Sequence, residues 1–491
     1  MLGVAGVAGV AVVALLAGAG WFYRSRTGGG ETIDSLAVLP FVNGSGDPSK
    51  EYLSDGIAES LISSLSQLPH LKVMSRDSAF RYKGKDADAE TTGRELGVRA
   101  IFKGRVTQLG DNLDISAELI DARDNTQIWG QQYSRKASDI FELQTDIAKE
   151  ITTALRTRLT GEDEKRMAKS YTANPEAYQL YLEGRFWWNK RSEEGYNKGI
   201  KYFEQAIQKD SNYALAYDGL ADAYALLGIN GYVPPKEFLP KAKEAVLKAL
   251  EIDDTLAEAH TTLGFIETFS EWDWLDAERE FQRAIQLNPS YATAHQWYCP
   301  VLWQTGRLEE AVAESKRALQ LDPVSVIVNW NLGQSFYYAR RYDETIEQFR
   351  KTLDLDPNSI LALLGLGRAY VQTSRYKEGI AEFEKALVIS PNNQDGLSYL
   401  GYAYSVSGRR SEAQKVLDQL TALSKQKYVR PDFVAKVYVG LGEKDKAIVL
   451  LEKSYDDRSI GSLEIKMDPA FDPLRSDPRF KDLLRRMNLE P

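Results

Sequence analysis

The amino-acid sequence predicts an α+β N-terminal domain, a mixed sheet with helices, followed by an all-α solenoid and preceded by one transmembrane helix. Three observations predict this architecture. The N-terminus is a long uncharged apolar run, the next segment alternates between short apolar strands and amphipathic helices, and prolines recur every 34 residues in the C-terminal part. The predicted boundaries are a transmembrane anchor at 1–24, a linker at 25–32, an α/β domain at 33–160, a second linker at 161–174, about eight helical repeats at 175–458 and a capping segment at 459–491.

Composition excludes several classes of protein. With 491 residues, of which 43% are hydrophobic, the chain is long and apolar enough to form two or more domains. Its formal net charge is −9 and acidic residues are mixed with basic ones, so we expect no nucleic-acid partner, which would need a basic stripe. The one cysteine, Cys299, excludes an internal disulfide and a cysteine-based metal site. We expect neither a metal nor a cofactor.

The apolar run at residues 2–23 has about the ~20 residues that a helix needs to span a membrane. A cleaved signal peptide is the alternative, because residues 17–19 (AGA) resemble a cleavage site, but no basic residue precedes the run. A retained single-pass anchor is therefore favoured. The small-residue pairs Ala5/Gly9 and Ala14/Gly18 would let two anchors pack closely, which makes a homodimer through the anchor possible.

The segment after the anchor reads as alternating strands and helices. A buried strand at 36–41, a helix ending near Leu68 and a second strand at 71–74 form a β-α-β unit. Turn residues Gly110 and Asn125 lie between alternating segments, which indicates hairpins. The remaining predicted elements are a helix at 89–96, strands at 100–108, 113–120 and 126–133, and a closing helix at 138–159.

Four motifs in this segment resemble the TolB-amino-terminal-type domain: residues 36–41 (LAVLPF), 52–56 (YLSDG), 94–98 (RELGV) and 127–129 (QIW). The resemblance covers about residues 33–159. It implies a bacterial protein in which this domain lies between a membrane helix and helical repeats, behind a cytoplasmic serine/threonine kinase, adenylate cyclase or winged-helix module.

The same resemblance implies a sensor or docking domain on the extracytoplasmic, periplasmic side. Arg24 and Arg26 follow the apolar run, and the positive-inside rule applied to them alone predicts the opposite orientation. The domain order outweighs these two arginines, so we expect the bulk of the chain to be periplasmic. An effector module that is missing or encoded upstream is also expected.

The C-terminal part has the period of the tetratricopeptide repeat. Prolines at 289, 323, 357 and 391 are 34 residues apart, and Leu-Gly pairs recur at 332–333, 366–367 and 400–401. Glycine allows two helices to approach closely, and proline ends each second helix. Such solenoids bind proteins or peptides along a concave groove lined by the first helix of each repeat.

The repeat register places an aromatic and amide stripe in this groove. Tyr, Trp and Arg dominate many interfaces because they bury a large area at low entropic cost. The alternative for any single aromatic side chain is that it fills the gap between neighbouring hairpins. The predicted partner-binding residues are Gln296, Trp297, Trp303, Trp330, Asn331, Gln334, Tyr337, Tyr338, Arg368, Gln372, Tyr399 and Tyr402.

An enzyme is not predicted. The polar turn at 43–47 (NGSGD) lacks the spacing of a phosphate-binding loop, and His260 and His295 have no companions at metal-ligand spacing. The sequence therefore predicts a non-enzymatic, membrane-anchored scaffold or signalling sensor that binds a protein or peptide. The alternative is a small-molecule sensor half of a signalling protein, with its ligand between the N-terminal domain and the first repeats.

Overall fold

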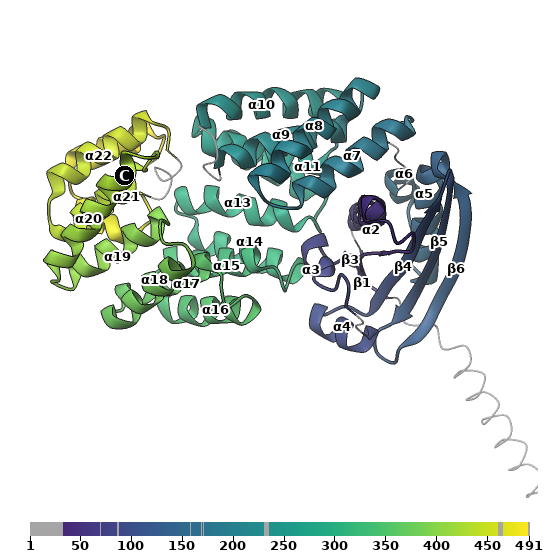
Figure 1. The fold of residues 1–491 in the computed structure, drawn as a ribbon, viewed down its shortest axis with the longest axis horizontal. Helices are drawn as coiled ribbons and strands as arrows, with labels where there is room; N and C mark the ends of the chain where they lie inside the picture. The colour runs from purple at the N-terminus through teal and green to yellow at the C-terminus, as the bar shows by residue number, and fades with distance from the viewer. Residues whose placement is uncertain are drawn as a thin grey trace, which may run out of the picture.

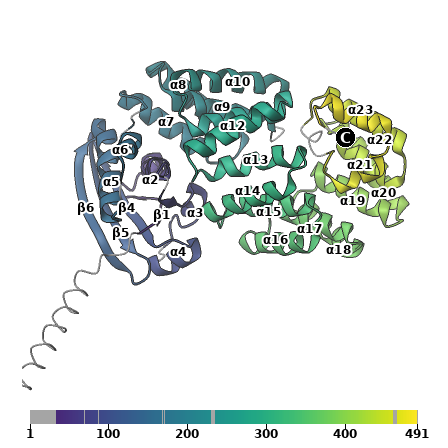
Figure 2. The same cartoon turned by 180° about the vertical axis from the view of Figure 1, so that it is seen from behind.

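The computed structural model shows an N-terminal mixed sheet with helices followed by an all-helical region (Figures 1 and 2). This confirms the predicted order of an α+β domain and an all-α solenoid. The predicted anchor at 1–24 and linker at 25–32 lie outside the described residues. Within the described part, no helix combines the length and apolar character that a membrane crossing requires. The structure describes residues 33–68, 70–85, 88–157, 159–167, 169, 171–229, 235–459 and 465–489.

The N-terminal sheet has the strand order β3-β1-β4-β5-β6, and β2 pairs with β4. Strand β1 is parallel to both of its neighbours, whereas β4, β5 and β6 are joined by antiparallel pairing. A parallel pair needs a crossover connection, and helix α2 supplies it between β1 and β3. The bounds are β1 Ser35–Val38, β2 Val42–Asn43, α2 Glu51–Ser66, β3 Lys72–Val73, β4 Ala100–Leu109, β5 Asn112–Asp121 and β6 Thr126–Lys136.

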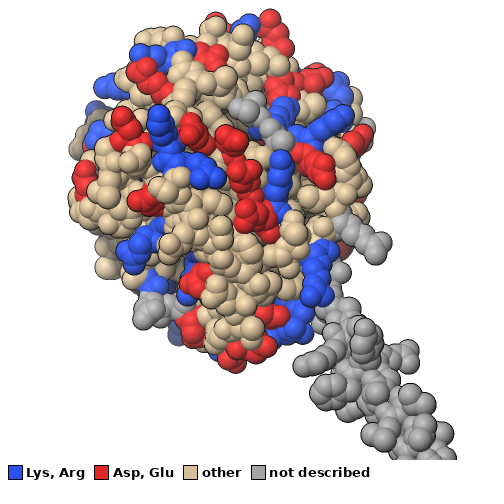
Figure 3. Space-filling model, turned by 90° about the vertical axis from the view of Figure 1, so that its right-hand side faces the viewer, with Lys and Arg blue, Asp and Glu red and all other residues tan. Residues whose placement is uncertain are grey.

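One face of this sheet carries the domain core. Leu113, Ile115 and Leu119 alternate along β5 and are buried, because successive side chains of a strand point to opposite faces. Helices α2 and α5 (Ile140–Ala154) lie between the sheet and the solenoid (Figures 1 and 2). On the outer surface of the N-terminal domain, basic and acidic side chains are intermixed (Figure 3).

Several predicted elements of the domain need correction. The strand predicted at 36–41 ends at Val38, and β2 begins only at Val42, because the intervening Pro40 has no N–H to donate to a neighbouring strand. The helix predicted at 138–159 ends at Ala154. Helix α6 (Gly161–Met167) lies in the segment predicted as a linker. Helix α4 (Ala89–Leu96) and the hairpin strands lie where they were predicted.

Helix α3 (Arg76–Phe80) was not predicted. With five residues it is too short to show an apolar helical period. Ser75 caps it, with its Oγ accepting a hydrogen bond from the backbone N–H of Ser78. The helix is nevertheless important for the arrangement of the two domains, because it contacts the loops of the solenoid.

The all-helical region consists, in the described residues, of eight antiparallel helical hairpins formed by α7 to α22. The first helices of successive hairpins lie next to one another and line the concave side. Their bounds are α7 Pro175–Trp188, α9 Ala214–Ile229, α11 Ala257–Ile266, α13 Ala292–Gln304, α15 Val326–Tyr338, α17 Ile360–Gln372, α19 Gln394–Val406 and α21 Pro431–Leu441. The second helices are α8 Glu193–Lys209, α10 Pro235–Ile252, α12 Trp274–Leu287, α14 Leu308–Leu321, α16 Tyr342–Leu355, α18 Tyr376–Ile389, α20 Arg410–Ser424 and α22 Lys444–Asp456.

Glycine sets the spacing between hairpins. The ring of Phe349, which is fully buried, lies between Gly333 and Gly365. A Cβ atom at Gly333 would come within 2.6 Å of this ring, and one at Gly365 within 2.4 Å. The small residues of the repeat pattern are therefore required by the close approach of an aromatic side chain.

The C-terminal segment folds back onto the solenoid through a 3-10 helix, η5 (Pro469–Leu474), and helix α23 (Pro478–Arg486). Trp274 of the third hairpin donates a hydrogen bond from Nε1 to the backbone oxygen of Met487 at 3.0 Å. Asn488 donates to the backbone oxygen of Trp272 at 3.3 Å. The end of the chain thus packs against a hairpin near the start of the solenoid.

Candidate functional site

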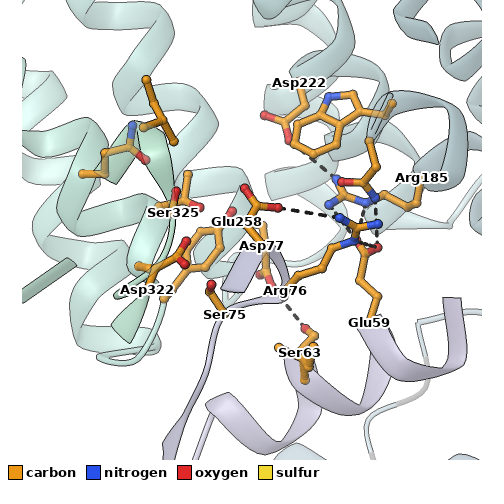
Figure 4. A pocket seen from close by; sticks show the side chains of 18 of the residues that line it. Glu59, Ser63, Ser75, Arg76, Asp77, Arg185, Asp222, Glu258, Asp322 and Ser325 are labelled. Atoms are coloured by element: carbon orange, nitrogen blue, oxygen red, sulfur yellow. Dashed lines mark hydrogen bonds and ion pairs between the residues drawn. The ribbon is translucent and has the colours of Figure 1, made fainter. Parts of the chain in front are cut away.

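A cavity of about 1160 Å³ lies between the N-terminal domain and the concave side of the first five hairpins (Figure 4). Helices α2 and α3 and the residues before α3 form one wall. Helices α7, α9, α11, α13 and α15 form the other. The cavity is therefore shared between two domains that are far apart in sequence.

Glu59 of α2 joins the two walls. Its carboxylate accepts hydrogen bonds from Nε of Arg76 at 2.9 Å, from Nε of Arg185 at 2.9 Å, and from the Asn189 side-chain amide at 3.0 Å. Figure 4 shows the carboxylate of Glu59 meeting both guanidinium groups. Burial alone would raise the pKa of Glu59, but Arg185 and Arg76 outweigh it and lower the pKa to about 2. This ion-pair network holds the helices of the two domains together.

Three acidic side chains form a second group in the cavity: Asp218 and Asp222 of α9 and Glu258 of α11. Thr262 Oγ1 lies 3.1 Å from Asp218 Oδ1 and 2.9 Å from Asp222 Oδ1. Ser63 donates to Glu258 at 3.3 Å. Burial raises the pKa of all three carboxyl groups, and the charges of Asp222 and Glu258 add to this effect at Asp218.

Aromatic side chains complete the solenoid wall. Phe265 and Trp297 have ring centroids 4.3 Å apart, and Tyr291 lies in the same cavity. Burial raises the pKa of Tyr291 well above its ordinary value, so its hydroxyl stays protonated. The site thus combines carboxylates, hydroxyl groups and aromatic faces, a set suited to binding.

Half of the predicted groove residues line this cavity. Trp297, Trp330 and Gln296 are only partly buried, so they present surface to an occupant. Trp303 is more enclosed, and its Nε1 donates to Ser335 Oγ at 2.9 Å. The predicted residues that line the cavity are Gln296, Trp297, Trp303, Trp330, Asn331 and Tyr338.

The other half of the predicted stripe lies beside the C-terminal segment. Asp468 is fully buried there, 3.1 Å from Lys436 Nζ and 3.9 Å from Arg368. Tyr399 donates to the Asp468 carboxylate at 3.1 Å, and Tyr337 is 1% exposed. These side chains surround a segment of the same chain. The residues outside the cavity are Gln334, Tyr337, Arg368, Gln372, Tyr399 and Tyr402.

The histidine and the cysteine on α13 are buried and have structural roles. His295 is buried between Glu314, at 2.5 Å from Nδ1, and the backbone oxygen of Pro289. Burial raises the pKa of Cys299 to about 12, which keeps the thiol protonated. Among the residues the structure describes, no cluster of three or more His, Cys, Asp or Glu is arranged to hold a metal ion.

Sequence reasoning missed the acidic residues of the cavity. Asp218 and Asp222 are four residues apart on α9 and therefore share one face of this helix. This spacing of two acids could have predicted an acidic group on that face. Glu59 carried no comparable signal, because its partners Arg76 and Arg185 come from other elements.

Next to the cavity, α3 contacts the loop before α15. Ser78 donates a short hydrogen bond to the buried carboxyl group of Asp322, and Arg81 donates to the backbone oxygen of Val324 at 2.6 Å. Burial, together with the nearby charge of Asp77, raises the pKa of Asp322 to about 6. Protonation of Asp322 is thus linked to the contact between the domains.

Asp322→Asn is expected to remove one pH-dependent component of stability. The pKa of Asp322 is raised from its ordinary value of 3.8 to about 6, so its stabilising effect is complete below pH 4 and is lost as the pH rises through 6. The difference corresponds to about 2–3 kcal/mol. Urea unfolding from pH 4 to pH 8 should show a flatter profile for the variant than for the wild type.

Asp354→Asn, which replaces an exposed acid on α16, is the control and should leave the pH profile unchanged. Parallel profiles for the wild type and Asp322→Asn would contradict the raised pKa.

Comparison with known proteins agrees with the solenoid. The tetratricopeptide-repeat family matches residues 273–326 and 331–394, so these stretches are tetratricopeptide repeats. A Rhizobium meliloti (strain 1021) protein named adenylate cyclase 3 is 31% identical over 286 residues, which are 56% of this chain and 41% of that protein. The Salmonella typhimurium transcriptional regulator HilA is 28% identical over 133 residues, 27% of this chain and 24% of that protein. The chain spans less than half the length of these relatives.

Solved structures with a similar arrangement include YrrB, described as a TPR protein with an unusual peptide-binding site. It is 22% identical, has a TM-score of 0.30, and the match covers 40% of this chain and 97% of YrrB. PilF of Pseudomonas aeruginosa is 23% identical with a TM-score of 0.35, covering 47% of this chain and 98% of that chain.

Proposed function

We propose that this protein is a non-enzymatic binding protein that captures a peptide segment of a protein partner in the cavity between its two domains. The observation that carries the proposal is the partly buried aromatic and amide surface of Gln296, Trp297 and Trp330, which faces an open volume of about 1160 Å³. Sites for small molecules are roughly 300–1,000 Å³, so this volume suits a peptide segment with several side chains. Tetratricopeptide repeats typically bind proteins or peptides in this way.

The wider role that we propose is that of a signalling sensor. Residues 1–24 would anchor the chain in a membrane, with residues 33–160 as a TolB-like domain and the bulk of the protein on the periplasmic side. A homodimer through the anchor is part of this proposal. The partial match to proteins named as an adenylate cyclase and a transcriptional regulator supports a place behind such an effector module.

A small-molecule sensor is the second candidate function. It is favoured by the position of the cavity between two domains, whose helices α2 and α7 are joined by the Glu59 network. A ligand held between two domains would change how firmly they are joined. Ligand-induced thermal stabilisation that disappears in Thr293→Trp would favour this candidate.

Peptide display on the full-length protein tests the main proposal. Thr293 lines the cavity at the start of α13, and tryptophan at this position would fill part of the volume. Thr293→Trp is expected to weaken the binding of selected peptides by about tenfold or more, because the occupied volume excludes the ligand. Affinities are measured by isothermal titration calorimetry.

Thr153→Trp on the exposed side of α5 is the matched control and should bind as the wild type does. Circular dichroism and the melting temperature check that both variants are folded. Selected peptides that bind both variants equally would refute the cavity as the binding site.

A further inference from the structure

More acidic than basic side chains line the cavity. Seven carboxylates and five basic side chains line it. The basic groups are engaged: Arg76 and Arg185 by Glu59, Lys169 by Asp253, Arg191 by Asp77, and Arg81 by backbone oxygens. Three of the other acidic side chains, Asp218, Asp222 and Glu258, lie on the neighbouring helices α9 and α11.

Among the described residues, Asp218 and Asp222 share one hydroxyl donor, that of Thr262. Thr262 Oγ1 is within 3.1 Å of both carboxylates, but its one hydroxyl hydrogen can be donated to only one of them at a time. Arg185 approaches Asp222 at 3.8 Å and is already bound by Glu59. Asp218 is 4% exposed, and a buried carboxyl group whose one hydroxyl donor is shared with a second carboxyl group is costly to ionise. The pair therefore calls for a positively charged donor.

A second and independent observation is the side chain of Gln304. It is 3% exposed and lines the same cavity, and its Oε1 has no hydrogen-bond partner in the described part of the chain. An amide oxygen accepts hydrogen bonds from N–H groups. The acceptor oxygens of Gln304 and of the Asp218–Asp222 pair therefore indicate an occupant with N–H groups that donate hydrogen bonds.

The aromatic side chains fit the same type of occupant. Tyr291 belongs to the cavity wall together with Asp218, Asp222 and Glu258. Phe265 of α11 and Trp297 of α13 line the same cavity, with tilted rings whose centroids are 4.3 Å apart. Aromatic faces beside carboxylates stabilise organic cations through cation–π interactions as well as through charge.

We propose that the bound peptide segment places a lysine ammonium or arginine guanidinium group against Asp218, Asp222 and Glu258. This inference rests on the proposed function and specifies the chemistry of its ligand. A metal ion is a poorer fit, because these acids do not form a metal-binding cluster among the described residues. The cation replaces the missing hydrogen-bond donor and offsets the charge.

The test uses peptides selected by display on the full-length protein. Each lysine or arginine of a selected peptide is replaced in turn with norleucine, which keeps the apolar stem and removes the charge. One replacement is expected to weaken binding to the wild type by about tenfold or more. Asp218→Asn and Glu258→Gln should weaken binding of the unmodified peptide to a similar extent, and should bind the norleucine peptide as the wild type does.

Asp354→Asn on α16 is the matched control, since it removes an exposed acid outside the cavity. Free cadaverine and agmatine are titrated in parallel, because small amines offer the same cation. Binding of either amine as tightly as the peptide would overturn a peptide side chain as the source of the cation.

Two further outcomes separate this inference from the proposed function. Peptides that bind in the cavity, as shown by their loss in Thr293→Trp, but tolerate every norleucine replacement would overturn the inference and leave the function intact. If no selected peptide depends on Thr293, both are wrong.

Discussion

Asp468→Asn is expected to destabilise the protein by about 3–5 kcal/mol, the range found when one partner of a buried ion pair is removed. Lys436 is 2% exposed and Arg368 is 6% exposed, and both charges face the Asp468 carboxylate. Asparagine has nearly the same shape but leaves both cations without a counter-charge. Urea unfolding at pH 7 measures the loss, which should be largest for probes in the last hairpins.

The stabilising effect of the Asp468 carboxylate should be lost in acid. Burial opposes its ionisation, but Lys436 and Arg368 prevail and lower the pKa of Asp468 to about 2. A lowered pKa means that its contribution is complete above the ordinary value of 3.8 and is lost as the pH falls toward 2. The wild type and Asp468→Asn should therefore approach each other in stability between about pH 4 and pH 2 and converge only below about pH 2.

Asp472→Asn is the control in the same segment. Asp472 is paired with Arg340 at the surface, where an ion pair contributes about 0–1 kcal/mol. Equal losses in the two variants would show that the buried position of Asp468 is not what matters.

Glu59→Gln is expected to have the second large effect, also about 3–5 kcal/mol. Glutamine can still accept a hydrogen bond, but it cannot neutralise Arg76 and Arg185, which both lie at the carboxylate. The contact between α2 and α7 should weaken first. Hydrogen exchange of the α2 and α7 amides, together with urea unfolding, measures this change.

Glu176→Gln provides a comparison on α7, where an exposed acid pairs with Lys209 at 2.8 Å. Its expected cost is about 1 kcal/mol or less. Unchanged exchange in Glu59→Gln would mean that the two arginines find other partners, and the network would then not hold the domains together.

The solenoid was predictable because its cause is local and repeated. Gly333 recurs 34 residues later as Gly367, and each approaches a buried phenylalanine ring, Phe349 and Phe383 respectively. The N-terminal strands were also predictable from their alternation, except where Pro40 divides one of them. Both patterns depend on residues that are close in sequence, so the sequence alone reveals them.

The candidate site was harder to predict because its parts come from distant segments. Glu59 and Arg185 are 126 positions apart, and Ser78 and Asp322 are 244 apart. Asp468 lies in a segment without repeat register, so its position inside the groove had no sequence signal. The register did place Trp297 and Trp330 on the concave side, and both line the cavity.

The hydrogen bonds from Trp274 to Met487 and from Asn488 to Trp272 have a mechanical consequence. In an ordinary repeat array each repeat contacts only its neighbours, so the array can extend and can unfold from its ends. Here the third hairpin also contacts the eighth hairpin and the C-terminal segment, so the hairpins from the third to the eighth form a closed loop. We therefore expect that any widening of the cavity would come mainly from the first two hairpins and the N-terminal domain, which lie outside this loop.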